Sequence, residues 1–368
     1  MCAHPRSVFR GALFGLVWSL ALPALAQDPP VVNVYNWSEY IDESILDDFT
    51  AATGIQVVYD VFDSNEMLET KLLTGATGYD VVFPSDGFLA RQIQAGVFQP
   101  LDPDKLPNLK HVWPEVTRRT VQFDPDNAYS INYMWGTTGF GYNVDMILER
   151  MPDAPLDSLR MLFDPEVVSR FEDCGVTMLD APADMVPMAL AYLGEDPASQ
   201  DPAVLAKAEA PLTAVRPFIR QFSNSEFIGA LASGDICLAA GWSGDVLQAR
   251  DRAEEADNGV EIGFIIPVEG AVMWFDQIAI PADAPNPDNA HAFLNFLLEP
   301  EIIARATDYV NYANGNLVSQ QYIDPEILSD PAVYPSEAVM ERLYVTHVYP
   351  PRVQRTVNRM WTRVKTGH

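Results

Sequence analysis

The sequence contains few basic residues, few histidines and few cysteines. Its 368 residues include 23 Lys and Arg against 51 Asp and Glu, so the formal net charge is −28, with 5 His and 3 Cys. This excess of negative charge repels phosphate backbones and anionic lipid headgroups, which disfavours nucleic acids and charge-driven membrane binding. Cationic and neutral partners remain. The 48% hydrophobic content indicates a globular protein with a packed core rather than a disordered acidic chain.

Sequence motifs of common catalytic sites are also missing. There is no Walker loop, no Gly-x-Gly-x-x-Gly after a predicted strand and no His-Glu-x-x-His. The segment Gly241-Trp242-Ser243-Gly244 is one residue too short for a nucleophile elbow. No metal-ligand spacing exists among His111, His291, His347 and His368. We therefore expect no enzyme, no cofactor and no metal; a secreted hydrolase is the alternative, which assays of amine and ester turnover would test.

Long apolar runs are missing after the N-terminus, and residues 1–26 have the pattern of a cleavable signal peptide. Arg6 and Arg10 precede an apolar stretch from Gly11 to Leu22, and Ala24-Leu25-Ala26 supplies small residues for cleavage before Gln27. No later window reaches about 18 uninterrupted apolar residues. The sequence therefore predicts a mature protein exported from the cytoplasm. An uncleaved membrane anchor is the alternative.

Two cysteines, Cys174 and Cys237, remain after the signal peptide is removed. In an oxidising compartment such a pair most simply forms one disulfide. It would close a loop of about 64 residues and stabilise the fold by roughly 4 kcal/mol in the chain-entropy model. The bond would also place both segments in the same lobe.

Strand-like and helix-like segments alternate along the mature chain. The first part has predicted strands at 31–35, 56–61 and 79–83 with helices at 41–52 and 67–73, the second beginning near Asp63 and Glu66. The later part has predicted strands at 139–143, 176–179 and 236–240, with helices at 185–193, 245–256, 290–298, 301–309 and 337–343. This order predicts two α/β lobes with mostly parallel sheets. The long apolar stretches 131–143 and 271–280 are predicted to cross between the lobes.

Aromatic and acidic residues gather at the ends of the predicted strands. They lie in Asn36-Trp37-Ser38-Glu39-Tyr40, Pro84-Ser85-Asp86-Gly87-Phe88, Asp180-Ala181-Pro182-Ala183-Asp184, Gly241-Trp242-Ser243-Gly244-Asp245 and Met273-Trp274-Phe275-Asp276. Ligands of open α/β sheets bind beyond the carboxyl ends of strands, so these segments are expected to meet in one cleft. Carboxylates and hydroxyls suit ammonium groups, and aromatic faces suit the methylenes between them. The pattern indicates an aliphatic amine with a cation at each end; solvated loop acids and core tryptophans are the alternative.

Several segments resemble the periplasmic putrescine-binding proteins of bacterial polyamine ABC transporters. They are residues 35–40, 58–66, 95–102, 137–145, 234–237, 312–314 and 361–365. The resemblance covers essentially the whole mature chain. It implies a two-lobed type II periplasmic binding protein fold with hinge crossings and a central ligand cleft. We expect lobe 1 to comprise residues 27–136 and 270–308, and lobe 2 to comprise residues 137–269 and 309–368.

The resemblance also implies a function and a set of site residues. The protein would bind putrescine or a related polyamine in the periplasm and deliver it to the ABC permease subunits in the inner membrane. The methylene chain would be walled by Trp37, Tyr40, Trp242, Trp274 and Tyr312. The amines would be bound by Ser38, Ser85, Asp184, Asp245 and Asp276, with Glu39 and Phe88 adjacent. Cys174 and Cys237 match the disulfide pair of these proteins.

Three positions depart from the putrescine-binding pattern. Asp86-Gly87 follows Ser85 where those proteins carry small or hydroxyl residues, and the additional acid Asp86 would recruit a third ammonium group or tighten binding of a diamine. Asp184 stands where a glutamate is usual, and Trp274 stands where spermidine binders have tryptophan and putrescine binders phenylalanine. We expect putrescine as the ligand. A spermidine-preferring binder and an amine sensor without transport are the alternatives.

Overall fold

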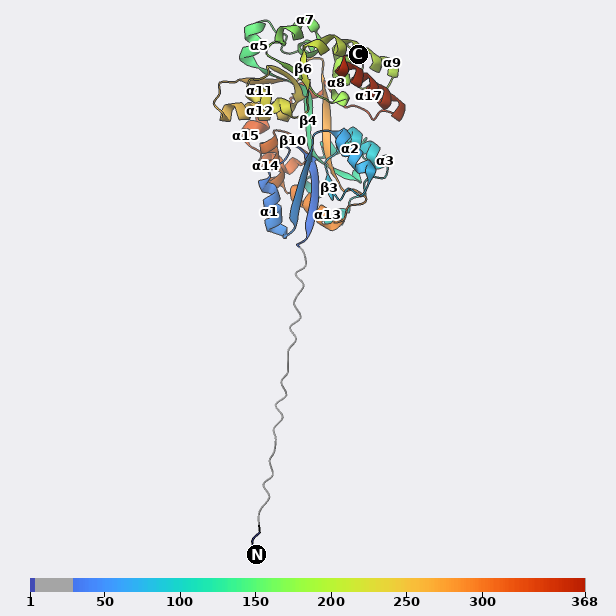
Figure 1. Cartoon of the computed structure of the whole chain (residues 1–368), viewed down its shortest axis with the longest axis vertical. Coiled ribbons are helices and arrows are strands. Elements are labelled where there is room, and N and C mark those ends of the chain that lie inside the picture. Colours follow the sequence, from blue (N-terminus) through green and yellow to red (C-terminus); the bar gives the residue numbers. More distant parts are fainter. Residues whose placement is uncertain (4–28, 368) are drawn as a thin grey trace.

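A computed structural model describes residues 1–3 and 29–367, and Figure 1 shows them as two lobes joined by long strands. The predicted signal peptide, residues 1–26, falls almost entirely outside this range. No helix among the described residues is both long and apolar enough to cross a membrane.

The first lobe begins with the predicted alternation of strands and helices. Strand β1 (Val31–Trp37) pairs in parallel with β2 (Gln56–Phe62) and β3 (Val81–Val82), while α1 (Ser44–Thr53) and α2 (Asn65–Thr74) form the connections. These elements confirm the predicted order of strands and helices in this region. The structure differs after β3, because helix α3 (Asp86–Gln94) begins where a loop was expected. Asp86 therefore lies in the first turn of a helix.

The N-terminus of α2 differs from the prediction by one residue. Ser64 is the N-cap, and its Oγ accepts a 3.2 Å hydrogen bond from the backbone N–H of Met67. Asp63 therefore precedes the helix, and the cap is formed by Ser64 instead of the predicted pair of Asp63 and Glu66. Both side chains line the pocket described below.

Two long strands join the lobes. Strand β4 (Ser130–Asn143) pairs with β9 (Ala271–Ala279) through its first half and with β7 (Leu238–Trp242) through its second half. The strand order is β2-β1-β3-β9-β4-β7-β5-β6. The predicted crossings are therefore confirmed as strands shared between the two halves of the sheet. The expectation of mostly parallel pairing fails at the centre, because β9 runs antiparallel to both β3 and β4.

The second lobe is built around its own hydrophobic core. Strands β5 (Val176–Met178) and β6 (Ile219–Phe222) pair with each other, and β5 also pairs with β7. Helices α8 (Pro182–Tyr192), α11 (Glu226–Ala232), α12 (Ser243–Glu255) and α17 (Pro351–Thr366) contribute buried residues to this core. The Cys174–Cys237 disulfide is present, with Cα atoms 5.5 Å apart, and both residues belong to the same core. This confirms the predicted bond.

The segment that follows β9 packs against the core of the first lobe. Helices α13 (Pro287–Leu297) and α14 (Pro300–Val310), together with Tyr312, pack into the core of the first lobe. The side-chain amide of Asn316 donates a 2.8 Å hydrogen bond to the carbonyl of Leu298 and fixes the following segment there. Val310 and Tyr312 therefore pack against the first-lobe core, and α17 packs against the second-lobe core. The exact boundaries stay a proposal.

The remaining elements connect or cover these two cores. They are α4 (Pro114–Thr120), α5 (Val144–Arg150), α6 (Arg160–Phe163), α7 (Pro165–Val168), α9 (Pro202–Leu205), α10 (Glu209–Val215), β8 (Ile262–Ile265), β10 (Ala313–Asn314), α15 (Pro325–Ser329), α16 (Glu337–Met340) and β11 (Leu343–Tyr344). The helix predicted at 337–343 is confirmed only in its first part, since it ends at Met340.

Candidate ligand-binding site

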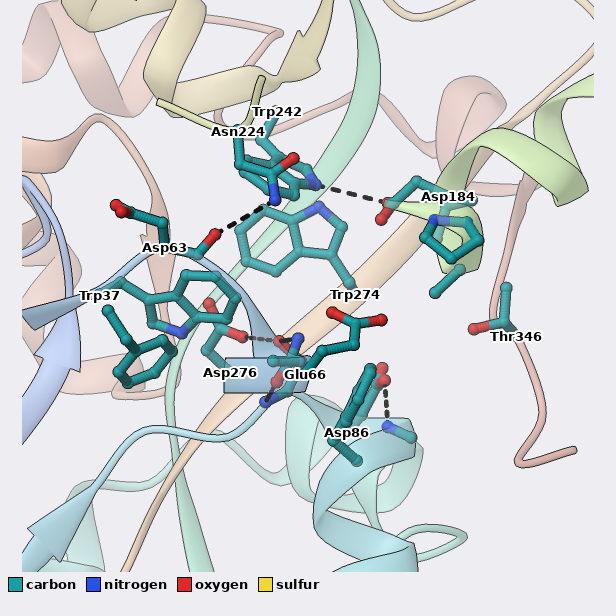
Figure 2. A pocket seen from close by; sticks show the side chains of 18 of the residues that line it. Trp37, Asp63, Glu66, Asp86, Asp184, Asn224, Trp242, Trp274, Asp276 and Thr346 are labelled. Atoms are coloured by element: carbon teal, nitrogen blue, oxygen red, sulfur yellow. Dashed lines mark hydrogen bonds between the residues drawn. The ribbon is translucent and has the colours of Figure 1, made fainter. Parts of the chain in front are cut away.

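A pocket lies between the two lobes and encloses a cavity of about 110 Å³. Its walls come from the ends of β1, β2 and β7, from Ser85 after β3, from the first turns of α3, α8 and α12, and from β9. Figure 2 shows the rings of Trp37, Trp242 and Trp274 gathered around one space, with acidic side chains beside them. The strand ends that the sequence predicted to converge therefore do so.

Aromatic rings from both lobes form the apolar part of the wall. Trp37, at the end of β1, has its ring centroid 6.2 Å from that of Trp242, at the end of β7. On the other side Tyr312 lies 5.0 Å from Trp274 and 5.6 Å from Tyr40, measured between ring centroids. The indole N–H of Trp37 donates a 2.9 Å hydrogen bond to the carbonyl of Phe83, which fixes the orientation of its ring. These faces suit the methylene chain of an amine and attract its charged ends.

Asp276 provides a carboxylate from the crossing strand β9. Its Oδ2 accepts a 2.7 Å hydrogen bond from the hydroxyl of Tyr40, and its Oδ1 accepts a 2.5 Å hydrogen bond from the hydroxyl of Ser85. Asn65 in turn holds Ser85, because its amide N–H donates to Ser85 Oγ at 2.9 Å and its Oδ1 accepts from the Ser85 backbone N–H at 3.1 Å. Both oxygens of Asp276 are thus oriented by neutral groups and retain lone pairs for a cationic ligand.

The second lobe supplies Asp184 and Asp245, each in the first turn of a helix. Oδ1 of Asp184 accepts a 2.6 Å hydrogen bond from the hydroxyl of Thr138 and a longer one, 3.4 Å, from the indole N–H of Trp242. Oδ1 of Asp245 accepts a 2.8 Å hydrogen bond from the hydroxyl of Tyr312. These partners are neutral, so they orient the carboxylates without compensating their charge.

Asp86 brings a fourth carboxylate to the pocket. It is buried, its Oδ1 accepts a hydrogen bond from the backbone N–H of Gly87, and its Oδ2 accepts one of 3.3 Å from the backbone N–H of Phe275. Figure 2 shows Asp86 on the same side of the pocket as Thr346, away from Trp37. The carboxylate therefore lies in a part of the pocket that extends beyond the three tryptophan rings.

All four carboxylates are held in conditions that oppose their negative charge. Burial is the main cause, and it raises the pKa of Asp184 to about 6, of Asp245 and Asp276 to about 7, and of Asp86 to about 8. Repulsion from Asp276 adds to the increase in pKa at Asp86 and Asp245. Among the residues that the structure describes, no basic side chain forms an ion pair with any of the four, and Arg91, which lines the pocket, pairs with Glu69 at 2.9 Å. The pocket therefore favours a ligand that brings at least two positive charges.

The structure brings together all but one of the predicted ligand-binding residues. The pocket is lined by Trp37, Ser38, Tyr40, Ser85, Asp86, Phe88, Asp184, Trp242, Asp245, Trp274, Asp276 and Tyr312. Glu39 is not among the lining residues. Its Oε2 accepts a 2.9 Å hydrogen bond from the guanidinium group of Arg252 in α12, and the two side chains form a salt bridge. The hydroxyl of Ser38 donates to Asp63 at 2.7 Å, so in this structure it is engaged with a neighbouring acid. The ligand contacts themselves stay a proposal.

Several lining residues were not predicted from the sequence. Asn65 and Glu66 follow the end of β2, and the strand-end argument would have found them if β2 had been treated like the other strands. Asn224 joins the lobes, since its side-chain amide donates a 3.2 Å hydrogen bond to the carbonyl of Asp63. The segment from Thr346 to Tyr349 also lines the pocket. It has no sequence signal, because its position depends on how the chain returns to the second lobe before α17.

Comparison with known proteins gives the same assignment. The family described as bacterial extracellular solute-binding protein matches residues 44–335. The chain belongs to this family. It is 48% identical over 353 residues to the putrescine-binding periplasmic protein SpuD of Pseudomonas aeruginosa, covering 96% of each chain, and 44% identical to the putrescine-binding periplasmic protein PotF of Escherichia coli, covering 100% of each. A putative spermidine/putrescine ABC transporter structure from Listeria monocytogenes is 32% identical, with a TM-score of 0.82 over 92% of this chain and 99% of that one.

These likenesses confirm the two-lobed fold of periplasmic solute-binding proteins. They also confirm the resemblance to polyamine binders on which the sequence analysis relied, since both curated relatives align along nearly the whole chain. Members of such a solute-binding family act outside the cytoplasm, which agrees with the predicted export of this chain.

Proposed function

We propose that this protein captures putrescine in the periplasm and delivers it to the permease of an ABC transporter. The observation that carries the proposal is the set of four carboxylates around an aromatic pocket with no basic partner among the described residues. The names of the relatives from Pseudomonas aeruginosa and Escherichia coli support putrescine as the ligand. The proposed activity is binding and release, with no bond made or broken.

In this proposal the two ends of the diamine are held by different lobes. Asp276, oriented by Tyr40 and Ser85, would bind one ammonium group, and Asp245 with Asp184 would bind the other. The four methylenes would lie against the tryptophan rings. Because closure adds the second-lobe carboxylates to those on the first-lobe side, the ligand favours the closed state by the free energy of these added contacts.

The contacts across the cleft support closure as the response to ligand. Arg252 of the second lobe pairs with Glu39 of the first, and Asn224 donates to the carbonyl of Asp63. Both contacts join surfaces that must separate for a ligand to enter. The free and bound proteins should therefore differ in radius of gyration, which small-angle X-ray scattering with and without putrescine would measure.

Calorimetric titration of the mature protein tests the proposed ligand. Putrescine, cadaverine, agmatine, spermidine and spermine are compared at one salt concentration, and the ligand is recovered afterwards for mass spectrometry. The proposal expects one-to-one binding that is tightest for a diamine, with the ligand recovered unchanged. Absence of binding to every amine would contradict it, and chemical conversion of the ligand would contradict the proposed lack of catalysis.

A triamine is the second candidate, and Asp86 is the observation that favours it. This carboxylate lies in the pocket beyond the tryptophan rings, where a third ammonium group would be compensated. If the wild type prefers spermidine, Asp86→Ala should lose that preference while keeping its affinity for putrescine. If the wild type prefers putrescine and Asp86→Ala does not change the ratio of the two affinities, the triamine candidate is rejected.

A further inference from the structure

Helix α12 contacts the two lobes through different faces. One face packs into the second-lobe core with Val246 and Ala249. Gly244, Gln248 and Asp251 follow one another at intervals of four and three residues, so they share another face of the helix. In Figure 1 α12 lies next to α14 of the first lobe, where the two lobes meet. This second face is therefore turned toward the first lobe.

The second face of α12 contacts the end of α14. The side-chain amide of Gln248 donates a 3.3 Å hydrogen bond to the carbonyl of Val310, and Oδ2 of Asp251 accepts a 2.7 Å hydrogen bond from the side-chain amide of Asn311. Val310 belongs to the first-lobe core. These hydrogen bonds therefore join the lobes.

At Gly244 the backbone of α12 comes so close to the first lobe that no side chain fits. A Cβ atom at this position would lie 2.5 Å from the carbonyl oxygen of Val310 and 2.6 Å from the ring carbons Cδ2 and Cε2 of Tyr312. Carbon atoms in ordinary contact are about 3.5–4.0 Å apart. Both neighbours belong to residues of the first-lobe core, so the obstacle to a side chain comes from the opposite lobe.

Neither neighbour has room to move aside. The oxygen of Val310 is a backbone atom in the last turn of α14. The ring of Tyr312 is buried, and its hydroxyl donates a 2.8 Å hydrogen bond to Asp245. On the other side of the ring, a Cβ atom at Gly136 of β4 would lie 2.9 Å from Cδ1. Tyr312 thus fills the space between two glycines, and a side chain at Gly244 would require the lobes to move apart.

We propose that Gly244 is the residue that permits the lobes to close, and that a side chain at this position holds the protein open. The inference rests on the proposed function, because it concerns the closure that accompanies ligand binding. Lobes that stay apart do not bring the carboxylates of Asp184 and Asp245 to the first-lobe side of the site, so the ligand loses those contacts. Gly244 does not line the pocket, and it acts on binding only by setting how closely the lobes approach.

The stability of the ligand-free protein separates this role from a purely structural one. Alanine is a better helix former than glycine, so Gly244→Ala should not destabilise α12 when the lobes are apart. If α12 instead kept its contacts with Val310 and Tyr312 in the open protein, the same substitution would lower the melting temperature without ligand. Binding and ligand-free stability are therefore expected to respond differently.

The test compares Gly244→Ala with the matched control Gly229→Ala in the full mature protein. Gly229 lies in helix α11 of the second lobe, is exposed, and has open space where a Cβ atom would stand. Calorimetric titration with putrescine measures the affinity of each variant, and thermal unfolding without ligand measures its stability.

Chemical cross-linking measures closure directly. Glu39 and Arg252 form a salt bridge across the cleft, so cysteines at these two positions come within reach of a short bismaleimide when the lobes close. Glu39→Cys with Arg252→Cys is therefore introduced into the wild type and into both glycine variants. The native pair Cys174 and Cys237 is already joined in a disulfide and does not react. The rate of cross-linking, with and without putrescine, reports how often the lobes close.

We expect Gly244→Ala to bind putrescine at least about tenfold more weakly than the wild type, and to cross-link at least about tenfold more slowly in saturating putrescine. Its ligand-free melting temperature should be equal to that of the wild type or higher. Gly229→Ala should match the wild type in all three measurements. Wild-type affinity and cross-linking in Gly244→Ala would overturn the inference, as would a lower ligand-free melting temperature, a failure to fold, or equal losses in the control.

The ligand-free cross-linking rates keep the inference separate from the proposed function. If no amine binds the wild type, the proposed ligand is rejected. Slower ligand-free cross-linking in Gly244→Ala alone would then still support the role of Gly244, and equal rates in the three proteins would reject it. Absence of cross-linking in the wild type under every condition would show that the lobes do not close as proposed, and would overturn the inference.

Discussion

The hydroxyl of Tyr312 donates a 2.8 Å hydrogen bond to Oδ1 of Asp245 and accepts one of 3.1 Å from the Asp245 backbone N–H. Tyr312 belongs to the first-lobe core, whereas Asp245 begins helix α12 of the second lobe. The pair therefore joins the lobes at the ligand pocket. In this closed arrangement the hydrogen bond orients the Asp245 carboxylate at the pocket.

The first prediction concerns the carboxylates assigned to the two ends of the diamine. Asp245→Asn and Asp276→Asn should each weaken putrescine binding by about 2–5 kcal/mol, because an ammonium group would then be buried without its counter-charge. Calorimetric titration measures the change. Asp153→Asn, which removes an exposed carboxylate, is the matched control and should bind as the wild type does. Wild-type affinity in Asp245→Asn would show that the site is assigned incorrectly.

The sequence was sufficient to place most of this site because strand ends are local features. Trp37, Asp184 and Trp242 each follow a short β-branched or apolar run, and parallel strands within a lobe bring such ends to one edge. Glu39 shows the limit of this reasoning. It is adjacent to Ser38 and Tyr40, but its backbone φ of 57° turns the chain, and its side chain pairs with Arg252 outside the pocket.

The parts that sequence could not predict depend on long-range packing. Antiparallel pairing of β4 with β9 arises because one strand leaves the first lobe and the other returns to it, a relation with no local sequence signal. The same holds for residues 310–319, whose attachment to the first lobe depends on contacts such as Asn316 with Leu298. Helix α3 was missed because Ser85-Asp86-Gly87 is typical of a turn, although Asp86 in fact begins the helix.

The second prediction concerns the pH dependence of the ligand-free protein. Burial raises the pKa of the four pocket carboxyls to values from about 6 to about 8, above the usual value in an unfolded chain, about 4. Between about pH 4 and pH 8 the folded state therefore holds more protons than the unfolded state, so this group of residues makes stability fall as pH rises. Melting temperatures of the ligand-free protein should decrease from pH 5 to pH 8.

Acids whose pKa is lowered by a basic partner, such as Asp173 beside Arg150 and Glu209 beside Arg363, do not obscure this trend. They stabilise the folded state above about pH 4 and lose that effect only below it. Asp276→Asn should reduce the slope between pH 5 and pH 8. A melting temperature that rises through this range in the wild type would contradict the prediction.

The third prediction follows from the same carboxyls and concerns proton release. A dicationic ligand requires ionised carboxylates, so putrescine should bind more weakly at pH 5 than at pH 8 and should displace protons near neutral pH. Titrations in two buffers of different ionisation enthalpy measure the number of protons released. We expect release at pH 7 in the wild type and less release in Asp245→Asn. Identical heats in both buffers would mean that these carboxyls are already ionised without ligand.

The fourth prediction concerns the salt bridge between Glu39 and Arg252 across the cleft. Both side chains are partly exposed, at 48% and 39%, so the pair should stabilise the closed state by no more than about 1 kcal/mol. Glu39→Gln should therefore weaken putrescine binding by about fivefold or less, and the loss should shrink at high salt because exposed charges are screened. A double-mutant cycle with Arg252→Gln isolates the pair. A hundredfold loss in Glu39→Gln would instead indicate direct contact between Glu39 and the ligand.

The last prediction separates the stability of the second lobe from its binding function. The disulfide joins residues 63 positions apart within the second-lobe core, so Cys174→Ala with Cys237→Ala should lower the free energy of unfolding by roughly 4 kcal/mol. Urea denaturation measures the loss. Neither cysteine lines the ligand pocket, so putrescine affinity should stay within about twofold of the wild type at low temperature, where both proteins are folded.

A reducing agent should lower the stability of the wild type to that of the double variant and leave the double variant unchanged, because no other disulfide exists among the described residues. A large loss of affinity with unchanged stability would mean that the bond positions β7 and Trp242 for the ligand rather than stabilising the lobe.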